Sequence, residues 1–402
     1  MESINALNIA GLPKIYFGAG KFSELPETIS SLGRNALIII GGESFKKSGR
    51  WNALTPKLNQ AQIKYRAVSV WDEPATEVID AIVSGFRRTP VDVVVAIGGG
   101  SVIDFGKAVS AMLVSDGSVK DYLEDVGTKK PSGAKVPFIA TPTTAGTGSE
   151  ATKNAVVCDR IEGYKKSLRH DAFMPDAALI DPELTLTLPP HITTACGLDA
   201  VSQLIESYTS AKADVSDVPD APIDSLVLKA LSGVSDSLIP LALGQSNDIS
   251  LRAKMSYAAL VSGITLNRFG LGAVHGIAGP MGGLCPVPHG VACGKLLFPV
   301  MTFVIKKIID EKNITAQKRF ADIGKILSGD TGGDTGGDDD IFYCKQFLSV
   351  LDKWTRTLNI PQLSCFGMTA LHMEKIIALA DSKNSPAILS KEEIKVILEV
   401  VR

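Results

Sequence analysis

The feature that most constrains the fold is a series of short, continuously apolar runs in the first half of the chain. Segments with helical spacing of their apolar residues, such as residues 75–88, separate them. The runs are NALIIIGG (35–42), IKYRAVSVW (63–71), VDVVVAIGGG (91–100), KVPFIATP (135–142) and DAALIDP (176–182). Strands that are apolar on both faces and alternate with helices are typical of a parallel sheet covered by helices on both sides. We therefore predict an α/β domain over residues 1–184.

The pattern changes after LPPHIT (188–193), where the Val- and Ile-rich runs stop. Long segments with apolar residues at helical spacing follow, including residues 194–210, 223–243, 251–267 and 392–401. We predict an all-α domain over residues 185–402. Two domains also suit the length of 402 residues, because single cores stop growing at roughly 250–300 residues.

Composition narrows the class of protein. A formal net charge of -2, with 45% hydrophobic and 21% charged residues, is typical of a globular enzyme and excludes a nucleic-acid partner. The N-terminus has no basic region before an apolar run, and no apolar stretch reaches about 18 residues, so we expect a cytoplasmic protein without a membrane partner. The 6 cysteines are scattered without CxxC pairs, which indicates reduced thiols. A glycine- and aspartate-rich stretch, 328–340, is predicted to be a solvated loop.

Two turns follow successive strands and carry groups that suit a nucleotide. The first passes from a buried strand through GGGS (98–101) into a helix, whose backbone amides can meet a phosphate. The second, TPTTAGTGSEAT (141–152), places Thr and Ser hydroxyls, including Ser149, at the carboxyl end of the next strand. Ligands of open α/β sheets bind at that edge. A GGGS turn alone is explained equally well by packing, and a Thr- and Ser-rich turn alone is usually only a turn. The two turns together, at successive strand ends, favour a nucleotide crevice.

Five motifs resemble the iron-dependent (group III) alcohol dehydrogenase family, in the family's order and over nearly the whole chain. They are GGGSVIDFGKA (98–108), PTTAGTGSEAT (142–152), DPELTLTLPP (181–190), ACGLDAVSQLIESYTS (195–210) and GLGAVHGIAGPMGGLCPVPHGVA (270–292). The resemblance implies a Rossmann-like dinucleotide-binding domain followed by a helical metal-binding and substrate domain, a fold like that of dehydroquinate synthase. It also implies an oxidoreductase that transfers a hydride between an alcohol, or its aldehyde or ketone, and NAD or NADP. Such enzymes hold a divalent metal, Fe²⁺ or Zn²⁺, and form homodimers.

The resemblance also assigns cofactor-binding residues. They are Gly99, Gly100, Ser101 and Asp104 in the first turn, Thr143 and Thr144 in the second, and Lys165 beyond it. Gly42 stands where NAD-preferring relatives carry an aspartate, and together with Ser44 it resembles the loop of NADP-using relatives. Glu43 is an acidic neighbour that weakens this argument, so the resemblance favours NADP over NAD and leaves both open.

The family's metal ligands, an aspartate and three histidines, fall on Asp199, Gln203, His275 and His289. Position 203 departs from the pattern, because an amide oxygen is a poorer ligand than imidazole for iron or zinc. Asp199, His275 and His289 remain a two-histidine, one-carboxylate set, which we predict to be catalytic as well as metal-binding. The alternative is that His275 is a core histidine, His289 a turn residue, and the metal is lost. Gly279 is a second departure, at a position where the family has a histidine near the substrate.

Three other functions stay open. A metal-independent NAD(P)H reductase of the maleylacetate-reductase type shares the architecture, and so does a zinc enzyme like glycerol dehydrogenase or dehydroquinate synthase. The third is a nucleotide-binding protein whose catalysis has decayed. Metal content measured together with cofactor turnover separates these alternatives from an alcohol dehydrogenase.

Overall fold

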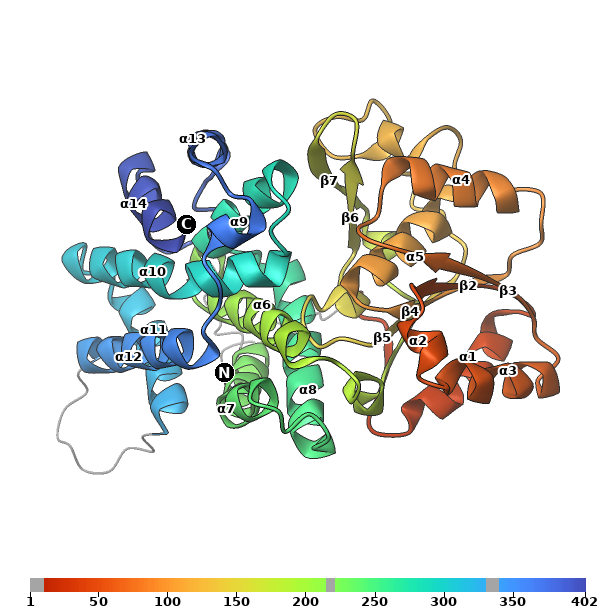
Figure 1. Ribbon diagram of the computed structural model, residues 1–402, viewed down its shortest axis with the longest axis horizontal. Coiled ribbons are helices and arrows are strands. Elements are labelled where there is room, and N and C mark those ends of the chain that lie inside the picture. Colours follow the sequence, from red (N-terminus) through yellow and green to blue (C-terminus); the bar gives the residue numbers. More distant parts are fainter. Residues whose placement is uncertain (1–10, 215–220, 330–339) are drawn as a thin grey trace, which may run out of the picture. The chain divides into compact units, whose positions relative to one another are not determined.

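The computed structural model describes residues 11–214, 221–329 and 340–402. The chain forms two compact units, Met1–Leu188 and Pro189–Arg402 (Figure 1). The sequence predicts a boundary at 184/185, which stays a prediction. Within the first unit, the Asp181 carboxylate accepts a hydrogen bond from the Phe22 N–H at 2.9 Å. Most of the stretch 328–340 lies outside the described residues.

Six parallel strands form the sheet of the first unit, in the order β1-β8-β5-β4-β2-β3. Their bounds are β1 Lys14–Phe17, β2 Asn35–Gly41, β3 Lys64–Val70, β4 Val93–Gly98, β5 Phe138–Pro142 and β8 Ala177–Ile180. The predicted parallel α/β sheet is confirmed. The sequence did not predict β1, because its residues KIYF are few and lie at an edge of the sheet with no fully buried side chain.

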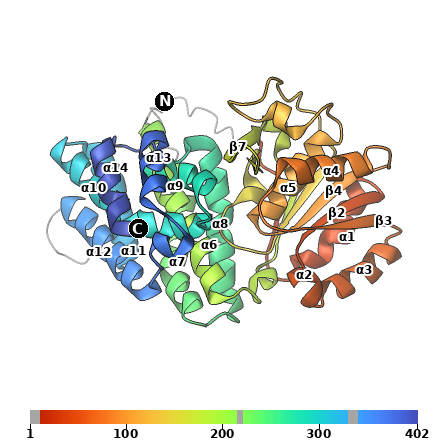
Figure 2. The same cartoon turned by 45° about the horizontal axis from the view of Figure 1, so that its top comes forward.

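Helices cover both faces of this sheet (Figure 2). Leu37 and Ile39 of β2 pack in one core with α4 (Thr76–Phe86) and α5 (Gly100–Met112). Ile38 and Ile40 face the other way and pack with α1 (Leu25–Leu32) and α3 (Arg50–Gln60). The helices that follow β2 and β4 therefore lie on opposite faces, which makes the carboxyl ends of these two neighbouring strands the switch point where such sheets bind ligands.

A separate antiparallel hairpin completes the first unit. It consists of β6 (Asn154–Asp159) and β7 (Tyr164–Arg169), and β6 packs beside α5. The sequence did not predict it, since YKKSLR has one buried residue and lacks the apolar character of the sheet strands. The remaining short elements are α2 Ser44–Lys47 and the 3-10 turns Lys21–Glu24, Val119–Tyr122, Ser149–Ala151, Asp171–Phe173 and Pro182–Thr185.

The second unit is helical, and no strand follows Ile180 in the described ranges. Its helices are α6 Pro190–Tyr208, α7 Ala221–Ala242, α8 Ile249–Phe269, α9 Ala273–Leu284, α10 His289–Asp310, α11 Ile314–Ser328, α12 Asp340–Leu358, α13 Ala370–Leu379 and α14 Lys391–Val401, with 3-10 turns at Ala211–Asp214 and Leu363–Phe366. Helix α6 packs against α7, α8 and α10, and its side chains from Gly197 to Tyr208 are all buried.

One segment, Ile223–Ala242 of α7, is long and apolar enough to cross a membrane by length and composition. The core helix of a soluble protein meets the same criterion, and α7 packs against α6, α8 and α11.

Candidate active site

The structure brings the two predicted nucleotide-binding turns into contact. Gly99 precedes α5, and no side chain caps the first turn of this helix. A Cβ atom on Gly100 would lie 2.5 Å from Oγ1 of Thr147, and one on Gly99 would lie 3.3 Å from Cγ2 of Thr144. Glycine is therefore needed for the two turns to approach this closely. The free N–H groups of Gly100 and Ser101 begin the helix beside the threonines.

The loop after β2 contains the two residues predicted to select the nicotinamide cofactor. Gly42 has φ of +46°, a conformation that favours glycine, and Ser44 is exposed at the start of α2. The Lys46 ammonium lies 3.7 Å from the carboxylate of Glu43 and donates to the Ser69 hydroxyl at 3.1 Å. No carboxylate replaces the family's aspartate at position 42, and the nearest acidic side chain on this loop is paired with a lysine.

Asp104 and Ser149, both predicted to bind the cofactor, bond to each other in the interior. The Lys107 ammonium donates to the Ser149 carbonyl at 2.9 Å and to the Thr152 hydroxyl at 3.0 Å, and Asp104 also accepts from the Val156 N–H at 2.9 Å. Burial raises the pKa of Asp104 and lowers the pKa of Lys107 to about 8. These side chains join α5, the second turn and β6, so their contacts in the structure hold the two turns in place.

The other predicted cofactor residues lie apart from this network. The Thr143 N–H donates to the Gly98 carbonyl at 2.9 Å, which fixes the second turn at the end of β4. The Lys165 ammonium, on β7, pairs with the carboxylate of Glu73 at 2.6 Å. A cofactor phosphate would therefore compete with Glu73 for this lysine.

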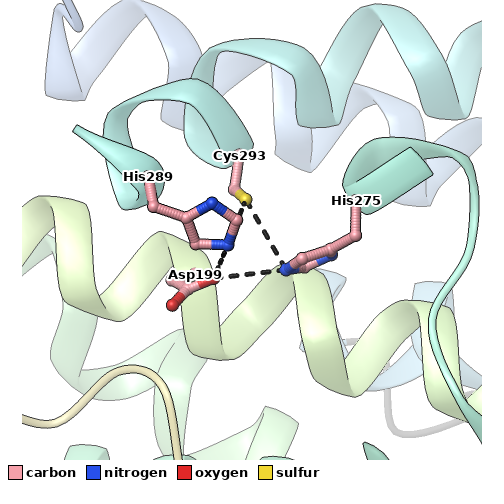
Figure 3. A group of neighbouring side chains, drawn as sticks. All are labelled: Asp199, His275, His289 and Cys293. Carbon is pink, nitrogen blue, oxygen red and sulfur yellow. Dashed lines mark hydrogen bonds and ion pairs between the residues drawn. The ribbon is translucent and has the colours of Figure 1, made fainter. Parts of the chain in front are cut away.

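Four side chains of the second unit converge in its interior (Figure 3). Asp199 comes from α6, His275 from the first turn of α9, and His289 and Cys293 from the first turn of α10. Oδ1 of Asp199 lies 3.3 Å from Nε2 of His275 and 3.6 Å from Nε2 of His289. Each member offers one donor atom, and the four atoms lie within 4.8 Å of one another. Three of the predicted metal ligands are thus brought together from parts of the chain far apart in sequence.

The cluster is strongly coupled electrostatically. The negative charge of Cys293 raises the pKa of His289 to about 9. Burial opposes protonation of His275, but Cys293 and Glu206 outweigh it and hold its pKa well above the usual value. Burial likewise disfavours the Asp199 carboxylate, yet the two histidines keep its pKa below the ordinary value. Negative and positive groups therefore stabilise one another here, and a metal ion would replace the protons on both imidazoles.

Glu206 orients one imidazole and starts the helix that carries it. Its carboxylate is 2% exposed and accepts from Nδ1 of His275 at 2.5 Å. The other oxygen accepts from the Val274 N–H at 2.5 Å and the His275 N–H at 3.4 Å, in the first turn of α9. The residue before this helix is Gly272, which has no side chain to cap it and whose Cβ would lie 3.0 Å from the Glu206 carboxylate. Glu206 therefore takes the place of the missing cap and leaves Nε2 of His275 free to face the cluster.

The side chain of Gln203, predicted as a metal ligand, contacts a hydroxyl group on α8. Its Oε1 accepts a hydrogen bond from the Ser262 hydroxyl on α8 at 2.8 Å. Gly279, the other departure from the family pattern, is exposed, and a Cβ there would meet nothing within 4 Å.

The sequence interpretation missed Cys293 and Glu206. Cys293 stands four residues after His289, and Glu206 seven residues after Asp199. Both spacings place the pairs on one face of a helix, which is the signal that could have found them.

Comparison with known proteins agrees with this geometry. Residues 13–182 match the model of the family described as iron-containing alcohol dehydrogenase, and residues 193–401 match the C-terminal model of the same family. The chain belongs to the iron-containing alcohol dehydrogenase family. It is 32% identical over 320 residues, 78% of this chain and 75% of the other, to the probable alcohol dehydrogenase EutG of Escherichia coli (strain K12). It is 29% identical, over 96% of this chain and 94% of the other, to long-chain-alcohol dehydrogenase 1 of Geobacillus thermodenitrificans (strain NG80-2).

The fold is shared with an archaeal alcohol dehydrogenase from a Red Sea brine pool, at a TM-score of 0.84 and 24% identity, over 97% of this chain and 98% of the other. As a member of the family, the protein is an NAD(P)-dependent alcohol dehydrogenase whose substrates are small-molecule alcohols and aldehydes. The family uses NAD or NADP together with iron.

Proposed function

We propose that Asp199, His275 and His289 hold the divalent metal of this alcohol dehydrogenase and are its catalytic residues. The observation that carries the proposal is the convergence of their donor atoms beside a carboxylate, Glu206, that fixes the tautomer of His275. One carboxylate and two imidazoles suit Fe²⁺ or Zn²⁺. When bound, such an ion supplies Lewis acidity that lowers the pKa of an alcohol hydroxyl and stabilises the negative charge left on oxygen.

The residues of the chain perform the remaining tasks. The Nδ1–H of His275 donates to Glu206, so that the lone pair of Nε2 points toward the cluster. Asp199 is buried and contributes negative charge, whereas the side chain of His289 is 41% exposed and marks the side of the cluster open to solvent. Gly279 has no side chain to accept a proton. We therefore propose that the proton of the alcohol leaves directly to solvent on the side of His289.

We propose that the first unit binds the cofactor at the carboxyl ends of β2 and β4. The uncapped N-terminus of α5 supports this, because its free N–H groups and the positive end of the helix dipole attract the diphosphate. Gly99, Gly100, Ser101, Thr143 and Thr144 line that position in this proposal, while Asp104 and Ser149 keep the turns together. In this proposal Lys165 leaves its ion pair with Glu73 and contacts the cofactor instead.

NADP is the preferred cofactor in this proposal. Gly42 offers no carboxylate to repel a 2′-phosphate, Ser44 offers a hydroxyl, and Lys46 offers a positive charge within the same loop. We further propose a cytoplasmic homodimer, as the family resemblance implies.

The proposal is tested with His275→Ala and His289→Ala, and with His191→Ala as a matched control, because His191 is exposed on α6 outside the cluster. Metal content after dialysis, alcohol oxidation and the Kd of NADP are measured for each protein. We expect both cluster variants to lose metal and turnover while keeping the cofactor affinity of the wild type.

The three alternatives give other results. Full activity in wild-type protein shown to be free of metal would establish a metal-independent reductase. The observation that favours this alternative is the hydrogen bond between the Gln203 amide oxygen and the Ser262 hydroxyl. Cofactor binding without turnover would establish a nucleotide-binding protein that has lost catalysis. Zinc with turnover of glycerol alone would establish the glycerol-dehydrogenase-like enzyme.

A further inference from the structure

We propose that the sulfur of Cys293 is the fourth metal ligand of this chain, in place of the side chain at position 203, and that the site consequently selects Zn²⁺ over Fe²⁺. The inference rests on the proposal that Asp199, His275 and His289 hold a divalent ion. It changes the ligand set from the family's aspartate and three histidines to one carboxylate, two imidazoles and one thiolate.

The spacing of the donor atoms supports four ligands around one ion. Sγ of Cys293 lies 3.6 Å from Nε2 of His275 and 3.6 Å from Nε2 of His289. In a tetrahedral zinc site, with bonds of about 2.0–2.1 Å to N and O and about 2.3 Å to S, nitrogen and sulfur ligands are separated by about 3.6 Å and nitrogen and oxygen ligands by about 3.3 Å. The separations of Asp199 from the histidines, 3.3 and 3.6 Å, fit the same tetrahedron.

Among the described residues, the hydrogen bonds recorded for the sulfur stay within the cluster. Cys293 is buried in the first turn of α10, four residues after His289, so both project from one face of the helix. The hydrogen bonds of its sulfur go to the two imidazoles of the cluster. Two other buried cysteines behave differently, because the thiols of Cys285 and Cys344 donate to backbone carbonyls of Met281 and Gln317.

The side chain at position 203, in contrast, already has a hydrogen-bond partner on another helix. Gln203 is buried, and its amide oxygen already accepts the Ser262 hydroxyl, so binding an ion would require this oxygen to serve both partners. Chemistry favours the same assignment, since a thiolate is a soft ligand that binds zinc well, whereas an amide oxygen suits hard ions such as Mg²⁺ and Ca²⁺. The exposed side of His289 leaves room for zinc to accept a further ligand, as catalytic zinc does when it expands to five-coordinate geometry.

The test uses metal-free protein prepared by dialysis against a chelator and then titrated with Co²⁺ or Zn²⁺ alone. Cobalt bound to a thiolate gives a charge-transfer band in the near ultraviolet that nitrogen and oxygen ligands do not give. We expect this band in wild type and in Cys285→Ser, the control with a buried thiol outside the cluster, and its absence in Cys293→Ser. Zn²⁺ affinity of Cys293→Ser should fall by more than about 100-fold, because losing a mere hydrogen-bond partner of a ligand already costs about 10–100-fold.

A second measurement needs no variant. Iodoacetamide should alkylate Cys293 of the wild type more slowly when Zn²⁺ is bound, while exposed Cys365 reacts at an unchanged rate as the internal reference. An unchanged cobalt spectrum in folded Cys293→Ser overturns the thiolate ligand, and so does equal alkylation of Cys293 with and without Zn²⁺ under conditions in which this buried thiol of the metal-free protein reacts. If wild type binds neither ion, the metal site proposed above fails and this inference fails with it, so the two failures are distinguishable.

Discussion

Replacing Glu206 by glutamine should show that one carboxylate serves both the stability of α9 and the binding of metal. In the native protein one oxygen accepts from backbone N–H groups of α9 and the other from Nδ1 of His275. Glutamine has a single acceptor oxygen, so its NH₂ group must face a donor on one of these two sides. A hydrogen bond to a charged group contributes about 1.5–3 kcal/mol, and a buried donor left unpaired adds a penalty of about 1–3 kcal/mol.

We therefore expect Glu206→Gln to lower the free energy of unfolding of the metal-free protein by about 2–4 kcal/mol. Metal affinity should fall by about 10–100-fold, or about 1.4–2.7 kcal/mol, since the imidazole loses the group that orients it. Urea unfolding followed by circular dichroism measures the first quantity, and titration with Zn²⁺ measures the second. Metal must be absent from the unfolding experiment, because a ligand bound to the native state alone would add its own stabilisation.

Glu374→Gln is the matched control, since Glu374 is exposed on α13 and should change stability by no more than about 0.5 kcal/mol. Wild-type stability and wild-type Zn²⁺ affinity in Glu206→Gln would refute the reasoning. Loss of stability with unchanged metal affinity would leave Glu206 as a helix cap only.

Three further predictions concern the first unit. Ser44→Asp should weaken NADP binding far more than NAD binding, because a carboxylate would lie beside the 2′-phosphate; equal losses in titrations of both cofactors would show that this loop does not read the phosphate. Gly100→Ala should destabilise the protein by about 1–3 kcal/mol and raise the KM for cofactor, because the new Cβ would meet Thr147 at 2.5 Å; an unchanged melting temperature and KM would contradict this. Burial raises the pKa of Glu150 from 4.5 to about 7, because the interior favours the neutral carboxyl group. The stability that Glu150 contributes through this shift is therefore complete below pH 4.5 and is lost as pH rises through 7. Glu150→Gln should therefore lose less stability than wild type between pH 5 and pH 8, a difference of up to about 3 kcal/mol in urea unfolding, and parallel pH profiles would exclude the effect.

The fold was predictable wherever the burial of side chains leaves a recognisable pattern of apolar residues in the sequence. Strands β2 and β4 are buried on both faces, and that alone produces the continuous apolar runs NALIII and VVVAI. Strands β1 and β7 have few buried side chains, and β6 buries only alternate residues, so none of the three carries a continuous apolar run. The helices of the second unit follow their periodicity, even though α6 is buried on nearly all sides.

The candidate site was predictable only in part, for a physical reason. Asp199, His275 and His289 were found because they occupy family positions, and the structure places them together. Cys293 and Glu206 act through distances that exist only after α6, α9 and α10 have packed. At position 203 the sequence identified the departure from the family but not the hydroxyl of Ser262 that engages the glutamine.

The pairing of Gln203 with Ser262 has a consequence for how this variant of the family can change over time. A single substitution to histidine would remove one of the two acceptors of the buried Ser262 hydroxyl, which also donates to the Ala259 carbonyl, and would insert a ring into a helix interface that now fits an amide. It would also place a fifth donor beside Cys293. Positions 203 and 262 therefore depend on each other, and a histidine at position 203 is best accommodated together with a change at position 262.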